Sequence, residues 1–334
     1  MKRVLLTGGL GYIGSHTAVA LADAGQSVVL FDNLSNSKCN VLDRLETITG
    51  TRFPFIKGDV RDTALLEETL QNQQIDAIVH FAGLKAVGES VETPLSYYEN
   101  NVVGTVSLLR AMTTVGLTSL VYSSSATVYG DPDYVPIDES HPRSATNPYG
   151  QTKLHIEDML RDLANSDPRW SIACLRYFNP VGGHESGLIG EVPNGVPNNL
   201  MPYITQVVRG IRNKLLIYGN DYETDDGTGT RDYIHVVDLA EGHLSALKSY
   251  KSAINIYNLG TGKGTSVLEL VNAFMNTNQV KISYEISERR SGDIAISYAD
   301  GSKAKNELNW EAKLTIEDMV RDSWNFEKNM NKYI

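Results

Sequence analysis

Short apolar runs alternate with amphipathic stretches through the first half of the chain. The runs are apolar at successive positions and are predicted to be strands: 4–7, 27–31, 53–56, 77–80 and 119–122, the last continuing to 125. Helical spacing of apolar residues is found at 15–24, 64–70, 95–112 and 147–163. Strands that are apolar on both faces and alternate with helices are typical of a parallel sheet covered on both sides. The pattern predicts an α/β protein with a Rossmann-type doubly wound parallel sheet.

The pattern changes near Arg176. Residues 180–202 hold five glycines and four prolines, which indicates a long loop, and such loops in compact proteins usually serve function. Beyond this loop, helices are predicted at 203–211, 237–249, 267–276 and from Thr315, and strands at 215–218 and 254–258. We therefore expect a larger nucleotide-binding domain over residues 1–175. A smaller C-terminal α/β domain over 176–334 would bind the substrate.

The acidic net charge argues against polyanionic partners. Among 334 residues, 30 Lys and Arg stand against 40 Asp and Glu, a formal net charge of −10, so non-specific binding to nucleic acid or anionic membranes is not expected. No apolar run approaches the ~18 residues of a membrane span, and the apolar run before Thr7 is too short for a signal peptide. We expect a cytoplasmic protein. Cys39 and Cys174 cannot form a disulfide framework, and no Cys/His spacing predicts a metal site.

A glycine loop joins the first predicted strand to the first predicted helix. Gly8, Gly11 and Gly14 form G-x-x-G-x-x-G, and the next strand ends at Asp32, 18 residues after Gly14. Glycines let backbone amides and a helix N-terminus approach a pyrophosphate, and an acid about 20 residues further on can grip a ribose diol. A carboxylate would repel a 2′-phosphate, which favours NAD over NADP. The alternative is a tight strand–helix turn with a capping Asp.

Tyr149 and Lys153 form a Y-x-x-x-K pair on a predicted helix, where positions i and i+4 share one face. A phenol with its free pKa of ~10 is a poor base, and a nearby ammonium group favours the phenolate. The pair would therefore accept a proton beside a hydride acceptor. Ser125, at the end of a strand, could hydrogen-bond the same substrate oxygen. The alternatives are a surface Tyr–Lys contact and a polar strand end.

Several blocks of sequence, spread over nearly the whole chain, resemble a known family. They are 7–14 (TGGLGYIG), 32–33 (DN), 80–90 (HFAGLKAVGES), 123–130 (SSSATVYG), 149–153 (YGQTK), 176–180 (RYFNP), 197–203 (PNNLMPY), 226–236 (DGTGTRDYIHV) and 289–293 (RRSGD). Together they are similar to the extended short-chain dehydrogenase/reductase family and, within it, to the UDP-hexose 4-epimerases. The resemblance implies an NAD-dependent isomerase that holds and regenerates its cofactor while it inverts C4 of a UDP-sugar through a 4-keto intermediate.

The resemblance also implies roles for particular residues. Tyr149 would take the proton of the sugar 4-hydroxyl, Ser125 would share the hydrogen bond to that oxygen, and Lys153 would hold the nicotinamide ribose and favour the phenolate of Tyr149. The implied cofactor shell is Gly8, Gly11, Tyr12, Ile13, Gly14, Asp32, Asn33, Asn36, Ser37, Asp59, Val60, Phe81, Ala82, Lys85, Asn100, Tyr149, Lys153 and Phe178. The implied substrate shell is Lys85, Ser125, Tyr149, Asn179, Asn199, Leu200, Leu216, Ile217, Tyr218, Arg231, Arg290, Asp293 and Ser297.

The residue types in the substrate shell suit a nucleoside diphosphate sugar. Arg231 and Arg290 offer forked donors to a diphosphate, although an Arg taken alone is more often part of a surface ion pair. Asn179 and Asn199 can donate to phosphate or sugar oxygens without adding charge, and Asp293 suits a ribose diol.

Position 297 departs from the pattern of family members restricted to plain hexoses, which carry a bulky Tyr there. Ser297 would leave room for an N-acetyl group, so UDP-GlcNAc and UDP-GalNAc are expected as further substrates. The alternative is that Tyr298 fills the space, although successive strand residues face opposite sides.

Other functions of the same fold fit the sequence less well. A 4,6-dehydratase would carry an Asp-Glu pair after Ser125, where Ala126 and Thr127 stand instead. A non-catalytic NAD sensor or a structural protein would not need the Ser, Tyr and Lys together with the two Arg. A homodimer through helices 95–112 and 147–163 is implied by the resemblance, unless the apolar stripes of both helices face the sheet.

Overall fold

The computed structural model of the chain describes every residue except 1, 196, 198, 250, 291 and 331–334. Asn198 and Ser291, which fall within two of the resembling blocks, therefore lie outside the described residues.

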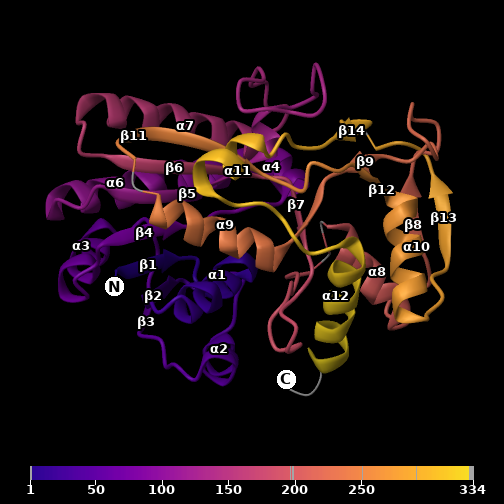
Figure 1. Cartoon of the computed structure of the whole chain (residues 1–334), viewed down its shortest axis with the longest axis horizontal. Coiled ribbons are helices and arrows are strands. Elements are labelled where there is room, and N and C mark those ends of the chain that lie inside the picture. Colours follow the sequence, from indigo (N-terminus) through magenta and orange to yellow (C-terminus); the bar gives the residue numbers. More distant parts are fainter. Residues whose placement is uncertain (1, 196, 198, 250, 291, 331–334) are drawn as a thin grey trace.

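A parallel sheet of seven strands forms the centre of the described chain, in the order β11-β6-β5-β4-β1-β2-β3 (Figure 1). The strands are β1 (Arg3–Thr7), β2 (Ser27–Asp32), β3 (Phe55–Lys57), β4 (Ala77–His80), β5 (Ser119–Ser125), β6 (Ser171–Tyr177) and β11 (Ala253–Leu259). Every pair of neighbours is parallel. The strand order reverses between β1 and β4, which makes the carboxyl ends of these strands the expected ligand crevice. The predicted doubly wound α/β fold is confirmed.

Helices cover both faces of this sheet, and side chains alternate between two cores. One core joins the sheet to α1 (Tyr12–Asp23), α2 (Val41–Thr49), α9 (Val236–Lys248) and α11 (Ser302–Leu308), and the other joins it to α3 (Thr63–Asn72), α6 (Gly104–Val115) and α7 (Pro148–Ser166). In β1, Val4 and Leu6 point into the first core and Leu5 into the second. Burial on both faces explains why these strands are apolar at successive positions.

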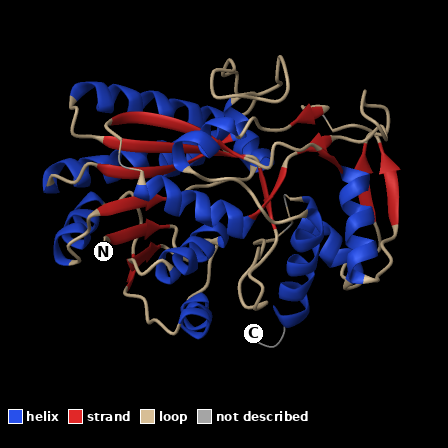
Figure 2. Ribbon diagram, in the orientation of Figure 1, coloured by secondary structure: helices blue, strands red, loops and turns tan. Residues whose placement is uncertain are grey.

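A smaller lobe lies at the carboxyl ends of the strands, at the right of Figures 1 and 2. Its helices are α8 (Leu200–Val208), α10 (Val267–Asn278) and α12 (Ile316–Met330), and Leu270, Phe274 and Val320 are fully buried between them and the nearby strands. Its strands form small sheets: β7 (Asn179–Val181) with β10 (Tyr233–His235), β8 (Leu215–Tyr218) with β13 (Tyr284–Ser287), and β9 (Thr230–Arg231) with β12 (Thr265–Ser266) and β14 (Ile296–Ser297).

The chain returns from the smaller lobe to the large sheet. β11 pairs with β6 from Ala253↔Ser171 to Leu259↔Tyr177, and α9 packs on α1, although both β11 and α9 follow residue 175. The apolar run at 254–258 predicts a strand, but a local pattern does not say which sheet the strand joins. The segments on the two sides of residue 175 are therefore interleaved in space, and the functional division at that residue stays a prediction.

The predicted helix at 95–112 is interrupted in the structure. After α4 (Val87–Glu92) come α5 (Pro94–Tyr97), a π-helical segment (Tyr98–Val103) and then α6. The wide turn carries the buried Asn101, whose side chain accepts from Leu84 N at 2.8 Å and donates to Leu84 O at 3.0 Å and to Thr152 Oγ1 at 3.2 Å. Such π segments occur often beside functional sites. Here the π segment ties the loop after β4 to α7.

Two other boundaries move for local reasons. The strand predicted at 53–56 begins at Phe55 because Pro54 has no N–H to contribute to the ladder. The helix predicted from Tyr203 begins at Leu200, since Asn199 takes an extended backbone at the N-cap and Pro202 is tolerated in a first helical turn.

Candidate active site

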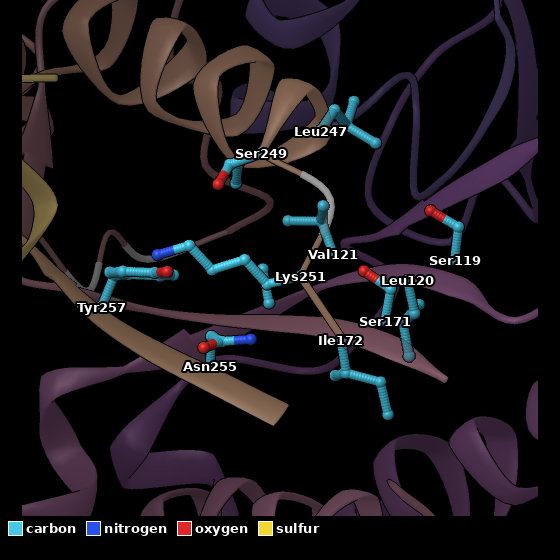
Figure 3. Close-up of a pocket in the computed structure, with 12 residues that line it drawn as sticks. Ser119, Leu120, Val121, Ser171, Ile172, Leu247, Ser249, Lys251, Asn255 and Tyr257 are labelled. Carbon is cyan, nitrogen blue, oxygen red and sulfur yellow. The ribbon is translucent and has the colours of Figure 1, made fainter. Parts of the chain in front are cut away.

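A cavity of about 750 Å³ opens where the large sheet meets the smaller lobe. The ends of β1, β2, β4 and β5 contribute Gly8, Asp32, Phe81 and Ser125 to its wall, so it lies at the topological switch point. A second hollow, shown in Figure 3, lies at the opposite ends of β5 and β6 beside Ser119 and has a volume of only about 10 Å³. That space suits a single water, so the large cavity is the candidate site.

The glycine loop fits a pyrophosphate group. Gly8 has φ +68°, and a Cβ added to it would lie 2.8 Å from Ala82 N. A Cβ on Gly14 would lie 2.3 Å from Gly8 O, so the first turn of α1 packs directly on the loop. No side chain caps α1 at Gly11, which leaves the amides of its first turn available to a ligand. The backbone is thus arranged as the dinucleotide motif requires.

Asp32 lies on the cavity wall at the end of β2. Its Oδ2 accepts from Leu10 N at 3.1 Å, and its Oδ1 accepts from Leu34 N at 2.9 Å and from Ser37 Oγ at 2.8 Å. These bonds fix the carboxylate and use both lone pairs of Oδ1, while Oδ2 keeps one lone pair for a hydroxyl donor. A hydroxyl of a ribose diol fits this position.

Most of the residues predicted to bind ligands line this one cavity. Those in its lining are Gly8, Gly11, Tyr12, Ile13, Gly14, Asp32, Asn33, Asn36, Val60, Phe81, Ala82, Lys85, Asn100, Ser125, Tyr149, Lys153, Phe178, Asn179, Asn199, Tyr218, Arg231, Arg290, Asp293 and Ser297. Five others lie outside the lining, each for a physical reason. Ser37 donates to Asp32, Asp59 forms an ion pair with Arg61, and Ile217 is buried in the core of the smaller lobe. Leu200 packs at the edge of that core, and Leu216 is exposed.

Tyr149 is placed at the cavity by the first turn of α7. Asn147 caps the helix by accepting from Gly150 N at 2.9 Å, and Pro148 occupies the first helical position. Burial raises the pKa of Tyr149 above 10, while a hydrogen bond from Ser125 and the positive charge of Lys85 oppose the rise. The cation that lowers the pKa of this phenol is therefore Lys85, whereas the predicted Lys153 lies with its Nζ 5.9 Å from the Tyr149 ring centroid.

Lys153 is buried one turn further along α7. Its Nζ donates to Ser123 O at 2.6 Å and lies 4.9 Å from the Tyr122 ring centroid. Burial lowers the pKa of this ammonium group to about 8, and the Glu157 carboxylate opposes that effect. At neutral pH Lys153 is therefore positively charged and fixed against the end of β5, next to Tyr149.

Glu157 anchors this arrangement from inside the protein. It is fully buried on α7 and accepts from Ser124 Oγ at 2.6 Å and from Arg176 Nε and Nη2 at 2.9 and 2.6 Å. Because removing one partner of such a buried pair is costly, the pair fixes α7 against the strand ends that carry Ser125. Glu157 was not among the residues predicted from the sequence, although it lies at i+4 from Lys153 and thus on the same helix face.

We expect Glu157→Gln to move the alkaline limb of the pH profile of kcat to lower pH. The carboxylate raises the pKa of Lys153, so its loss lets burial lower that pKa below about 8, and Lys153 loses its proton earlier as the pH rises. The profile is measured at saturating substrate. Asp158→Asn, which removes a more exposed carboxylate at the next position of α7, is the control and should leave the limb in place. An unchanged limb in Glu157→Gln would refute this electrostatic role.

The other end of the cavity carries two guanidinium groups and one carboxylate. Arg231 donates to Thr230 O at 2.9 Å, and both burial and the charge of Arg290 lower its pKa, although burial is the larger cause. Arg290 lies 4.7 Å from the centroid of the Tyr218 ring and pairs with Asp293 at 2.9 Å. Two cations that repel each other and share one carboxylate leave this end positive. A diphosphate would relieve that repulsion.

Ser297 lies on the same wall and Tyr298 does not. Ser297 is 8% exposed and pairs with Arg231 between β14 and β9, whereas a Cβ on Gly264 would lie 3.3 Å from the Tyr298 ring. Of these two neighbouring residues, the small Ser297 therefore lines the cavity, and the bulky Tyr298 is not part of the described lining.

Comparison with known proteins identifies the class. A family model described as GDP-mannose 4,6 dehydratase matches residues 5–323. The UDP-glucose 4-epimerase of Pasteurella multocida is 55% identical over 328 residues, which is 97% of each chain. The crystal structure of UDP-glucose-4-epimerase from Stenotrophomonas maltophila with bound NAD and formylated UDP-arabinopyranose has a TM-score of 0.98 at 48% identity and covers 100% of both chains. The Bifidobacterium longum enzyme in complex with NAD+ and UDP has a TM-score of 0.95 at 49% identity, covering 99% of this chain and 100% of its own.

The fold and the site thus define a nucleotide-sugar-modifying enzyme of the short-chain dehydrogenase/reductase class. Identity of 55% to a UDP-glucose 4-epimerase over 97% of each chain narrows the class to one family. The chain belongs to the UDP-glucose 4-epimerase family.

Proposed function

We propose that this chain is a UDP-glucose 4-epimerase that uses a resident NAD to interconvert UDP-glucose and UDP-galactose through a 4-keto sugar. One observation carries the proposal: Ser125, Tyr149 and Lys153 line the same cavity as a glycine loop that fits a dinucleotide and two arginines that suit a diphosphate. The two relatives of known structure, one with bound NAD and formylated UDP-arabinopyranose and the other in complex with NAD+ and UDP, support it.

The dinucleotide would be held by the glycine loop, Asp32 and Lys153. When bound, NAD+ supplies an acceptor for the C4 hydride and later the donor that returns it. The residues of the chain manage the proton. Tyr149 Oη accepts the proton of the sugar 4-hydroxyl, Ser125 Oγ holds the same oxygen, and Lys153 and Lys85 stabilise the phenolate whose pKa burial raises.

Inversion at C4 requires that the sugar presents either face to the same acceptor. Arg231 and Arg290 would hold the diphosphate at the far end of the cavity and leave the hexose to turn near Tyr149. Remote anchoring of this kind keeps the binding energy while the reacting ring changes orientation.

The test is turnover without added cofactor. Purified protein is incubated with UDP-galactose alone, and the products are separated by chromatography. Formation of UDP-glucose, together with NAD released on denaturation, supports the proposal. Absence of product in a folded, NAD-containing sample would overturn it.

A 4,6-dehydratase is the alternative suggested by the description of the family model. In the structure, Ser125 is followed by a short 3-10 turn at Ala126–Val128, where Thr127 N donates to Ser125 Oγ at 3.2 Å. Thr127 lines the cavity at this point and provides no carboxyl group for proton transfer at C5. This observation favours the epimerase.

The open position at Ser297 supports a broader substrate range, namely UDP-GlcNAc and UDP-GalNAc in addition to the plain hexoses. An N-acetyl group needs volume beside the sugar 2-position. Ser297 leaves that volume, and Tyr298 packs toward Gly264 instead of filling it.

We also propose a cytoplasmic homodimer. Leu95 is 81% exposed, Val91 63% and Val103 50%, and they lie on α4, α5 and the π segment, which pack beside α7. A group of exposed apolar residues on adjoining helices suits an interface with a second copy. Sedimentation at twice the chain mass is the expected result. Among the described residues, no helix is long and apolar enough to cross a membrane.

A further inference from the structure

Glu191 connects the two sides of the cavity. Its Oε1 accepts from Lys85 Nζ at 2.9 Å and from Asn199 Nδ2 at 2.6 Å. Lys85 comes from the loop after β4, on the side of the large sheet, and Asn199 is the N-cap of α8 in the smaller lobe. One carboxylate oxygen therefore joins two residues that lie far apart in the sequence and line opposite sides of the same cavity.

Glu191 is mostly buried beside the cavity and is bonded to two residues of its lining. Its side chain is 13% exposed and, unlike its two partners, does not belong to the lining. The preceding residues form a small hairpin, in which Gly183 bridges to Gly190 and His184 N donates to Ile189 O at 3.0 Å. Ile189 is buried in the core shared with the large sheet. The carboxylate therefore has a fixed place from which to orient its partners.

Both partners keep donors for a ligand. An ammonium group has three N–H donors and a side-chain amide has two, so the bonds to Glu191 use one of each. Burial is the largest single effect on the pKa of Lys85 and lowers it, but the charge and the hydrogen bond of Glu191, together with the charge of Tyr149, raise the pKa by more, which keeps the ammonium charged. The same carboxylate helps to raise the pKa of Tyr12 on the glycine loop, although burial is the larger cause. The charge of Glu191 therefore affects the pKa of Lys85 and that of Tyr12.

We propose that Glu191 is a positioning residue for the nucleotide sugar: it holds Lys85 and Asn199 across the cleft so that their remaining donors meet the diphosphate and the sugar. This inference deepens the proposed function and rests on it. Without the carboxylate, Lys85 would be free to take other rotamers, and the ligand would have to order that long side chain on binding. The cost would therefore appear in affinity.

The test compares UDP binding by NAD-loaded wild-type protein and Glu191→Gln, measured by titration calorimetry. The expected result is a Kd about tenfold weaker, which corresponds to about 1.4 kcal/mol, with the KM for UDP-galactose raised in parallel. Glu185→Gln removes the same charge from an exposed position of the same loop and should bind UDP like the wild type. An unchanged Kd, or a loss confined to kcat, would overturn the proposal.

A double-mutant cycle separates positioning from a general effect on the loop. In a Lys85→Met background, Glu191→Gln should weaken UDP binding by no more than about threefold, because one of its two partners is already gone. The full tenfold effect in that background would show that Glu191 acts independently of Lys85 and would refute the mechanism. Wild-type turnover of UDP-galactose is measured alongside. Its absence refutes the proposed function, whereas wild-type turnover with normal UDP binding by Glu191→Gln refutes only the role of Glu191.

Discussion

Replacing Tyr149 by Phe should lower kcat for UDP-galactose by about 1,000-fold or more, within the range that a positioned acid–base group contributes. The change removes only the phenolic oxygen, at the wall position where Ser125 and the charge of Lys85 converge. The measurement is single-turnover and steady-state conversion to UDP-glucose. The NAD content of the purified protein and its Kd for UDP should stay within about twofold of wild type, because the glycine loop and the arginines are untouched.

The matched control is Tyr257→Phe. Tyr257 is a buried tyrosine of β11 whose hydroxyl donates to Glu307 at 3.1 Å, so its loss should cost about 1 kcal/mol of stability and leave kcat near that of the wild type. If Tyr149→Phe retained kcat within about tenfold of wild type, the assignment of the proton acceptor would be wrong. If Tyr149→Phe lost bound NAD, its fall in activity would not report on proton transfer, and the assignment would lose this support.

Replacing Ser297 by Tyr should lower kcat/KM for UDP-GalNAc at least about 100-fold and change kcat/KM for UDP-galactose by less than about threefold. Ser297 is a small side chain on the wall, and a ring placed there would occupy the space that an N-acetyl group needs. Steric exclusion of one substituent affects the substrate that carries it and spares the one that does not. Competing turnover of the two sugars in one mixture gives the ratio directly.

Ser297→Ala is the control for this substitution. It removes the hydroxyl but keeps the space, so both substrates should be turned over as by the wild type. Equal losses on both sugars in Ser297→Tyr would show that position 297 does not act as a gate. Failure of the wild type to epimerise UDP-GalNAc would refute the broader substrate range and leave the plain-hexose activity standing.

Much of the fold could be predicted because its information is local. β1, the glycine loop, α1 and Asp32 follow from apolar runs, from glycines that a Cβ would disrupt and from an acid at a strand end. The membership of β11 in the large sheet could not be predicted, since its pairing with β6 depends on the path of the whole smaller lobe. The π segment could not be predicted either, because it is stabilised by side-chain hydrogen bonds from Asn101 to partners 17 and 51 positions away.

The residues of the candidate site also fall into those that the sequence predicts and those that it does not. Tyr149 and Lys153 are visible as an i, i+4 pair, and Ser125 as a strand end. Glu157 and Glu191 were missed because they act on Ser124, Arg176, Lys85 and Asn199, contacts that only the folded chain creates. The one signal for Glu191 was that it lies within the loop at 180–202 already marked by its glycines and prolines.

The most direct measurement follows the hydrogen at C4. UDP-galactose deuterated at that carbon is converted in ordinary water, and the UDP-glucose formed is examined by mass spectrometry and NMR. If Tyr149 handles only the hydroxyl proton while the carbon-bound hydrogen stays within the enzyme, the product keeps its deuterium at C4. Replacement of that deuterium by solvent hydrogen would contradict the account, because C4 would then exchange its hydrogen as a proton with water.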